Sequence, residues 1–272
     1  MTAINTNAGA LNARASAVSA TAKMERAMER PAAGVRVNSA ADDAAGLAVA
    51  GKMESQLRGI NMSIRNAQDG VGLIQTAESG LNEIRNMVLR IRELAVQMAN
   101  GIYENTPDRS NAQLEVTALI DQVTLIAENT RFNDVAVLDG SFTGVTIQAG
   151  NTTAETITLS FVDVASSGLS IDTATVATQS DATVAMGTMD TALETISQEQ
   201  AKFGSLINRL NYSIANQSNA SVMTEQAIGR VMDADFAAET TNLSKQQILN
   251  QAATSMLAQA NQSKQSILAL LQ

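Results

Sequence analysis

The fold of this chain is decided by one long stretch, 53-MESQLRGINMSIRNAQDGVGLIQTAESGLNEIRNMVLRIRELAVQM-98. Its apolar and small residues recur in alternating steps of four and three, the heptad seam of packed helices, with one residue dropped near Ala77. The seam consists of Met53, Leu57, Ile60, Ile64, Ala67, Val71, Ile74, Ala77, Leu81, Ile84, Val88, Ile91, Ala95 and Met98. A helix over this stretch is roughly 70 Å long, which indicates a rod rather than a compact domain.

Two further segments share this rhythm, and the three together predict a mainly α fold. The later segment places Met189, Leu193, Ile196, Gln200, Phe203, Ile207, Leu210, Ile214 and Gln217 on one seam. A shorter helix is predicted over about 109–130, with Val116, Leu119, Val123 and Ile126 on its apolar side. Because none of these helices is stable alone, we expect a long antiparallel helical bundle or coiled coil.

The region of about 139–178 predicts one small β-hairpin. Asp139-Gly140 is typical of a turn, and 149-AGNTTAE-155 is rich in turn formers. Apolar residues alternate with polar ones on either side of that connector, at Val145, Ile147 and Ala149 and again at Ile157, Leu159 and Phe161. A Ser/Thr-rich, low-complexity stretch follows up to the next helix.

Composition excludes several classes of function. The 272 residues include no Cys and no His, which excludes thiolate catalysis, imidazole acid–base catalysis and the usual Zn or Fe sites. The formal net charge of −9 argues against nucleic acid and against anionic membrane surfaces as partners. No apolar run approaches the ~18 residues of a membrane span.

One motif suggests a nucleotide site. The stretch 46-GLAVAGKM-53 satisfies seven of the eight positions of the phosphate-binding pattern G-x-x-x-x-G-K-[ST]. Met53, however, lacks the hydroxyl that holds Mg²⁺, and the preceding residues favour a helix start. Ser39 and Asp42 have capping-box spacing, and Asp43 suits the positive end of a helix. We therefore expect a helix with a solvated Lys52.

The other carboxylates are interpreted in the same way. The carboxylates of Asp42, Asp43, Asp233 and Asp235 could be interpreted as catalytic acids and bases. Helix caps and solvated charges are the simpler interpretation, because no cleft is indicated nearby. The sequence therefore predicts no enzyme, no metal and no cofactor.

Both chain ends carry weak apolar heptads that are rich in small residues. The N-terminal heptad is Ile4, Ala8, Leu11, Ala15, Val18 and Ala22, and the C-terminal one is Leu249, Ala253, Met256, Ala260, Ser263, Ile267 and Leu270. Each stripe buries too little area to offset the cost of ordering the backbone. We expect both ends to be loose in the free monomer and to fold against copies of themselves.

Ordered motifs at both ends carry a family resemblance. They are 34-GVRVNSAADDAAGLAVAGKM-53, 89-LRIRELAVQMAN-100, 130-TRFNDVAVLDG-140, 208-NRL-210, 232-MDADFAAET-240 and 247-QILNQAATSMLAQANQSKQSILALL-271. With these motifs, which cover about two thirds of the chain, the sequence resembles a short bacterial flagellin. The resemblance implies a structural subunit that polymerises into the flagellar filament for swimming motility.

The resemblance also implies a domain organisation. Residues 1–42 and 231–272 would form an inner coiled coil, and residues 43–230 a rod domain that includes the hairpin. Assembly of the inner core would use Ile4, Leu11, Val18, Leu249, Met256, Ile267 and Leu270. A spoke or hinge would connect the inner coiled coil, as the inner layer, to the rod domain, as the outer layer. It would contain Pro31, Gly34, Asn38, Asp42, Asp43 and Gly46.

Partners and location follow from the same resemblance. It implies binding to other flagellin subunits, to cap and hook-junction proteins, and to an export chaperone that covers the C-terminal helix. The N-terminus has neither the basic flank nor the apolar stretch of a cleaved signal peptide, so we expect type III export to an extracellular filament.

Two sites depart from the family pattern. The stretch 89-LRIRELAVQ-97 resembles a surface that Toll-like receptor 5 reads on some flagellins, with Arg90, Leu94 and Glu115 matching. Leu89 stands where recognised forms carry Gln, which removes a polar contact of ~0.5–1.5 kcal/mol.

In 30-RPAAG-34, Pro31 replaces a usual Leu, and we expect the first helix to end or kink near residue 30.

Two alternatives stay open at this point. A hook–filament junction protein of the flagellum shares flagellin-like ends, and polymer length on self-assembly would separate it from a filament subunit. An enzyme, either a nucleoside triphosphatase built on Gly46–Lys52 or a secreted hydrolase, belongs to a different class. Thermal stabilisation by nucleotide would support the first of these two enzymes.

Overall fold

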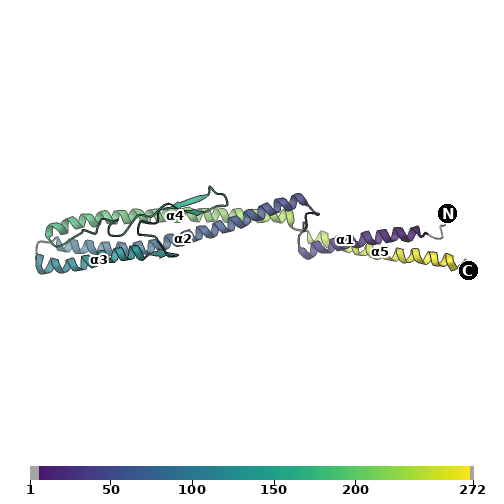
Figure 1. The fold of residues 1–272 in the computed structure, drawn as a ribbon, viewed down its shortest axis with the longest axis horizontal. Coiled ribbons are helices and arrows are strands. Elements are labelled where there is room, and N and C mark those ends of the chain that lie inside the picture. The colour runs from purple at the N-terminus through teal and green to yellow at the C-terminus, as the bar shows by residue number, and fades with distance from the viewer. Residues whose placement is uncertain (1–5, 270–272) are drawn as a thin grey trace. The chain divides into compact units, whose positions relative to one another are not determined.

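The computed structural model of the protein describes residues 6–269, with side chains described up to residue 263. Its elements, in chain order, are α1 (Ala8–Ala33), α2 (Ala44–Met98), η1 (Asn105–Arg109), α3 (Ser110–Asn129), β1 (Arg131–Phe132), β2 (Val135–Ala136), β3 (Val145–Gln148), β4 (Thr156–Leu159), α4 (Gln179–Met232) and α5 (Phe236–Ala269) (Figure 1). The chain divides into two compact units, residues 1–57 with 223–272, called here the terminal unit, and residues 58–222, the larger unit. The predicted domain boundaries at 42/43 and 230/231 fall close to the start of α2 and the end of α4. The domain assignment stays a prediction.

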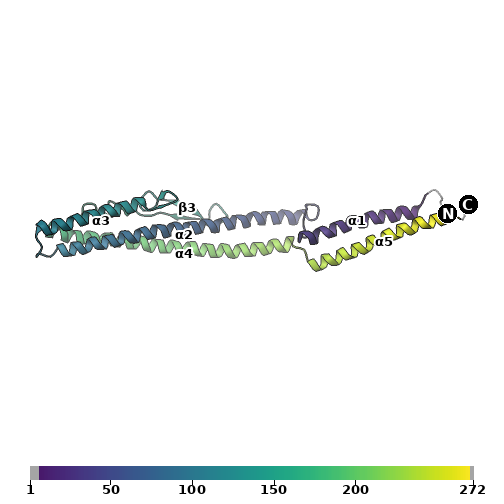
Figure 2. The same cartoon turned by 90° about the horizontal axis from the view of Figure 1, so that it is seen from below.

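In the larger unit, α2, α3 and α4 lie side by side along one apolar core (Figure 1 and Figure 2). From Ile60 to Met98, every predicted seam position of α2 is buried or half-buried. On α4, Met189, Ile196, Phe203 and Leu210 are buried as well. The mainly α fold with packed long helices is confirmed, because one seam on each helix supplies the shared core.

The end of α2 is joined to the start of α3 through Arg109. Its side chain is only 4% exposed. The guanidinium donates hydrogen bonds to the carbonyl oxygens of Met98 at 2.9 Å, Asn100 at 2.9 Å and Tyr103 at 2.5 Å, and to Oδ1 of Asn105 at 2.9 Å. These bonds satisfy the carbonyl group of Met98 at the end of α2 and two carbonyl groups of the loop that follows it. The helix that follows, α3, has the bounds that the sequence predicted to within about a residue.

The predicted hairpin is present and packs on the helices. Strands β3 and β4 are antiparallel, with Val145 opposite Leu159 and Gln148 opposite Thr156. The ring of Phe161, just beyond β4, lies 4.7 Å from the ring of Phe203 on α4. The apolar alternation in the sequence therefore marks the side of the hairpin that reaches the core.

A second, smaller hairpin was not predicted. Strands β1 and β2 pair through two residues each, and Asn133 and Asp134 form the turn with positive φ angles of 49° and 63°. Asn and Asp tolerate this left-handed conformation better than most residues. The dipeptide Asn-Asp was therefore the available signal.

The stretch after β4 corrects the low-complexity interpretation. Although it is rich in Ser and Thr, it buries Val164, Leu169, Ile171 and Val176 in the core of the larger unit. Buried Glu199 on α4 fastens its start, because Glu199 Oε1 accepts the Val162 N–H at 3.3 Å. The irregular spacing of these apolar residues hid them from a search for periodicity.

In the terminal unit, α1 and α5 run side by side (Figure 2). The less exposed face of α1 carries Ala10, Ala13, Ala17, Ala20, Met24 and Ala27, and that of α5 carries Leu243, Gln246, Asn250, Ala253, Leu257 and Ala260. Two polar contacts fix their register: Asn7 Nδ2 donates to the Ala260 carbonyl at 3.1 Å, and Asn250 Nδ2 to Thr21 Oγ1 at 2.8 Å. The contact face is therefore mostly Ala on α1, whereas on α5 it is a mixture of Leu, Ala and amide side chains.

The helix end predicted near residue 30 is wrong by about one turn. Helix α1 continues through Pro31 and ends at Ala33. Gly34 follows with φ 73°, and its N–H donates to the Arg30 carbonyl at 2.9 Å, a left-handed C-cap. Pro31 lies only three residues before this cap, so its ring fits within the last turn of the helix.

Candidate assembly site

The connector between α1 and α2, residues 34–43, pairs with the junction between α4 and α5. The Gly34 carbonyl accepts the Ala234 N–H at 3.2 Å, and the Arg36 N–H donates to the Met232 carbonyl at 2.6 Å. Arg36 Nη2 adds a bond to the Val231 carbonyl at 2.6 Å. The residues that follow α1 are therefore tied to the junction between α4 and α5 by two backbone bonds and one side-chain bond.

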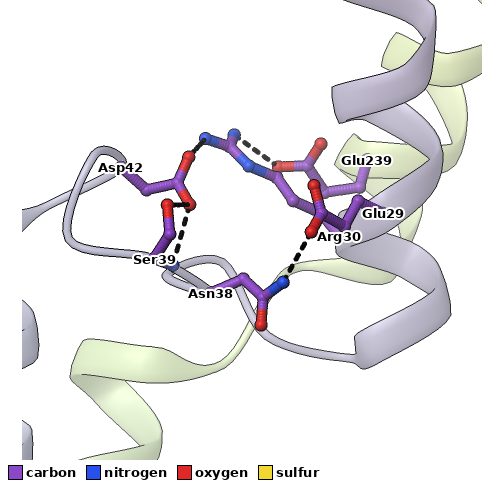
Figure 3. Close-up of polar contacts among 6 residues, drawn as sticks. All are labelled: Glu29, Arg30, Asn38, Ser39, Asp42 and Glu239. Carbon is purple, nitrogen blue, oxygen red and sulfur yellow. Dashed lines mark hydrogen bonds and ion pairs between the residues drawn. The ribbon is translucent and has the colours of Figure 1, made fainter.

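Figure 3 shows a charged cluster around Arg30 at this place. Arg30 Nη1 contacts Glu239 Oε1 on α5 at 3.3 Å, and Arg30 Nη2 contacts Asp42 Oδ1 at 3.6 Å. Asn38 Nδ2 donates to Glu29 Oε1 at 2.7 Å. Arg30 thus ties the end of α1 both to α5 and to the connector.

Asp42 closes a turn within the connector instead of capping α2. Its Oδ2 accepts the Ser39 N–H at 3.1 Å and the Ser39 hydroxyl at 3.0 Å. These hydrogen bonds from Ser39, assisted by the Arg30 charge, lower the pKa of the Asp42 carboxyl below its ordinary value. Asp42 is therefore a stable anion at neutral pH.

The cap of α2 is Asp43, which corrects the predicted capping box at Ser39. Asp43 directly precedes Ala44, and its Oδ1 accepts the Gly46 N–H at 2.8 Å. A β-carbon at position 46 would lie 2.3 Å from Asp43 Oδ2, so the residue three places after the cap has to be glycine unless Asp43 moves. Of the predicted spoke residues, Asn38 and Asp42 thus contact the end of α1, Asp43 contacts Gly46 at the start of α2, and Gly34 caps the helix that contains Pro31.

The predicted assembly residues within the described part of the chain are exposed. Leu11 is 57% exposed, Val18 63%, Leu249 46% and Met256 65%. We call these four side chains the outer stripe. They lie off the Ala-rich face that joins α1 to α5, and Leu249 and Met256 line a groove of about 520 Å³ together with Ala15 and Ser19. Of the remaining predicted residues, Ile4 and Leu270 lie outside the described residues, and the side chain of Ile267 is also outside them.

Of the three residues that match the receptor-recognition pattern, two are exposed and one is buried. Arg90 Nη2 pairs with Glu115 Oε1 at 2.8 Å and Nη1 with Glu93 Oε2 at 3.3 Å, and both Arg90 and Glu115 are exposed. The carboxylates raise the pKa of the Arg90 guanidinium. Leu94, in contrast, is 4% exposed, so it supports this surface from below.

The phosphate-loop interpretation is excluded by the local fold. Residues 46–53 lie inside α2 with no strand before them, and Lys52 is exposed on the helix. Within residues 6–269 no group of three or more Asp and Glu side chains could hold a metal ion. No helix in that range is long and apolar enough to cross a membrane.

Arg30 and Glu239 are two residues of this site that the sequence interpretation missed. Arg30 stands in the last turn of α1 and Glu239 in the first turn of α5. Antiparallel pairing of the two ends brings such positions to the same level, so opposite charges there were the available signal. Their separation by 209 positions concealed the pair.

Comparison with known proteins places this architecture in a class of helical filament subunits. The bacterial flagellin N-terminal helical region matches residues 4–143, and the bacterial flagellin C-terminal helical region matches residues 186–271. A flagellin of Halalkalibacterium halodurans is 37% identical over 98% of this chain and 99% of its own length. The flagellar filament 33 kDa core protein of Treponema phagedenis is 37% identical, with the same coverage of both chains.

Solved structures agree with these matches. The crystal structure of Bacillus cereus flagellin has a TM-score of 0.51 and 32% identity, covering 56% of this chain and 88% of that one. A flagellar hook-associated protein from Vibrio parahaemolyticus, at 13% identity and a TM-score of 0.59, shares the fold alone. The chain belongs to the bacterial flagellin family. It is a structural subunit of the flagellar filament and polymerises with other flagellin subunits, and no comparison favours the hook-junction alternative.

Proposed function

We propose that the outer stripe forms contacts between subunits in the inner core of the filament. The exposure of all four of its side chains in the single chain is the observation that carries this proposal. The Ala-rich seam already joins α1 to α5, so the larger apolar side chains are left for a second copy. Ile4, Ile267 and Leu270 would extend the same surface.

The energy of such contacts suits coupled folding and assembly. Burying one Val, Leu or Met side chain contributes about 1.5–3 kcal/mol. Four such side chains per subunit, repeated along a filament, would add to what the α1–α5 seam supplies within one chain. In this proposal residues 1–42 and 231–272 form the inner layer, and residues 43–230 the rod outside it.

Polymerisation of single-site variants tests the stripe. Val18→Glu is expected to abolish filament growth from seeds, because each subunit would bury an unpaired carboxylate at the interface. Met28→Glu is the matched control, since Met28 is also exposed on α1 but lies off the stripe. Sedimentation of seeded protein measures both variants. Equal growth of the two variants would contradict the proposal.

The connector is the proposed joint between the layers. Its support is the Arg30 cluster, which links α1, α5 and the turn at Asp42. A change in the last turn of α1 would alter the packing of the layers, so Pro31→Leu is expected to change filament waveform. Electron microscopy of the two filaments decides this, and identical helical forms would refute it.

Export and location complete the proposal. The subunit leaves the cell unfolded through the type III apparatus and is extracellular in the filament. A chaperone covers the C-terminal helix before export, and cap and hook-junction proteins contact the growing polymer. Support comes from the exposed apolar side chains Ile248, Leu249 and Met256 on α5.

Catalysis is not part of the proposed function. Residues 46–53 lie within α2 and form no phosphate-binding loop, so we expect no shift of the melting temperature with nucleotide and Mg²⁺. Recognition by Toll-like receptor 5 is proposed at the exposed Arg90–Glu115 pair. A cell reporter assay with monomer is expected to give a stronger response for Leu89→Gln than for the unchanged chain.

A further inference from the structure

The loop between α2 and η1 contains the one Asn-Gly pair of the sequence, Asn100-Gly101. Asn100 is exposed. Because Gly101 has no β-carbon, its backbone nitrogen can approach the side-chain carbonyl carbon of Asn100 with little steric hindrance. A backbone nitrogen in this position is a nucleophile next to an amide.

The local hydrogen bonds favour attack on this amide. The Ile102 N–H donates to Asn100 Oδ1 at 3.3 Å, and such a donor stabilises the negative charge that develops on an attacked carbonyl oxygen. Within residues 6–269, no acceptor is found for the Gly101 N–H. The proton of the Gly101 N–H, which is lost in the reaction, is therefore not engaged in a hydrogen bond within the loop.

We propose that Asn100 is a site of spontaneous deamidation. The Gly101 nitrogen loses its proton to water or hydroxide and bonds to Asn100 Cγ. The bond from Cγ to the side-chain nitrogen breaks, and this nitrogen takes up a proton and leaves as ammonia. Water then opens the resulting succinimide at one of its two carbonyls, which gives aspartate or isoaspartate.

The surroundings give this modification a structural consequence. The Asn100 main-chain carbonyl accepts bonds from Arg109 Nη2 at 2.9 Å and from the Tyr103 N–H at 3.4 Å. In isoaspartate the main chain runs through the former side chain, and this carbonyl becomes a free carboxylate. The isoaspartate product therefore places a negative charge beside a buried guanidinium that otherwise bonds to neutral oxygens.

The modification can be measured on the full chain. Purified protein is incubated at mildly alkaline pH and digested with trypsin, which releases residues 93–109 as one peptide. This peptide also contains Asn105, which is followed by the β-branched Thr106 and serves as an internal control. Asn100 is expected to convert at least about tenfold faster than Asn105, a difference of about 1.4 kcal/mol in activation free energy.

Mass spectrometry detects the change from amide to acid, and isoaspartyl methyltransferase labels the isoaspartate product. Gly101→Ala is expected to slow the conversion by at least about tenfold. Its new β-carbon meets nothing closer than the Gln179 side chain at 3.6 Å, so the variant folds.

Incubation of the chain in denaturant shows whether the fold permits the reaction. The proposal fails if Asn100 converts no faster than Asn105. It fails also if the folded chain reacts more than about tenfold slower than the denatured chain, since the loop would then protect the site.

Discussion

The larger unit and the terminal unit are both built from long helices, yet they are held together differently. The larger unit buries large side chains such as Ile74, Leu81 and Phe203. Of the described residues in the terminal unit, the buried apolar ones are Ala20, Ala27, Val37 and Ala50. The larger unit therefore has an extensive core of its own, whereas the terminal unit buries few large side chains, as expected under the proposal that neighbouring subunits stabilise it.

The largest expected effect tests the core of the larger unit. Phe203→Ala is expected to lower the free energy of unfolding by about 3–5 kcal/mol, because it leaves a cavity beside Phe161. Chemical denaturation of the monomer measures the change. Tyr212→Ala is the control on the same helix, since Tyr212 is 78% exposed and should cost about 0.5 kcal/mol or less. A similar loss of unfolding free energy in both variants would show that the buried core does not stabilise the larger unit more than its exposed residues do.

The next effect tests the thin seam of the terminal unit. Ala20→Leu is expected to destabilise the α1–α5 pair by about 1–3 kcal/mol, because the larger side chain forces the helices apart. Amide exchange of α1 in the assembled filament measures the loss of protection. Ala22→Leu makes the same change at an exposed position and should leave exchange nearly unchanged. If Ala20→Leu increased protection, the seam would be underpacked and the comparison with the larger unit would have to be revised.

A smaller effect is expected at the charged cluster. Arg30→Gln removes the partners of Glu239 Oε1 and Asp42 Oδ1 at a partly exposed site, and should cost about 1 kcal/mol. Loss of the Arg30 charge should affect Glu239 in particular, because Glu239 Oε2 is already buried without a hydrogen-bond donor in the described structure. Arg26→Gln changes the charge equally at an exposed position on the same helix. Amide exchange near Gly34 should become faster in Arg30→Gln and stay unchanged in Arg26→Gln.

The smallest effect is a dependence on pH in the connector. The pKa of Asp42 is lowered by Ser39, so the charged carboxylate stabilises the turn at pH above its unfolded value of about 4. This contribution is lost as the pH falls through the lower, folded pKa. Titration of the Asp42 carboxyl carbon by NMR should show a higher pKa in Ser39→Ala. An unchanged midpoint would show that Ser39 does not hold the anion.

Much of the larger unit could be predicted from its sequence, because large apolar residues at heptad spacing define both the helix and its buried face. The bounds of α3 and the pairing of β3 with β4 followed from the same kind of local signal. The burial of Val164 and Ile171 did not, because irregular chain segments have no periodicity to detect.

The site was less predictable because its contacts join distant parts of the chain. The sequence located Gly34, Asp42 and Asp43 at one connection, but it assigned the cap of α2 to Ser39 instead of Asp43. The intramolecular seam of α1 was hidden by the more apolar stripe beside it, since Ala10, Ala17 and Ala20 are weak markers of a buried face. Arg30 and Glu239 could be paired only after the two ends were placed side by side.

The turn between β3 and β4 has a practical consequence. Residues 151–155 are exposed, while Gln148 Nε2 closes the turn at its base through the Gly150 carbonyl at 2.8 Å. Surface turns of this kind tolerate added sequence when the strands on both sides stay paired. A foreign peptide inserted after Thr153 would leave the apolar core of the larger unit untouched. Such a chain could serve as a scaffold for antigen display, with one epitope carried by each repeating unit.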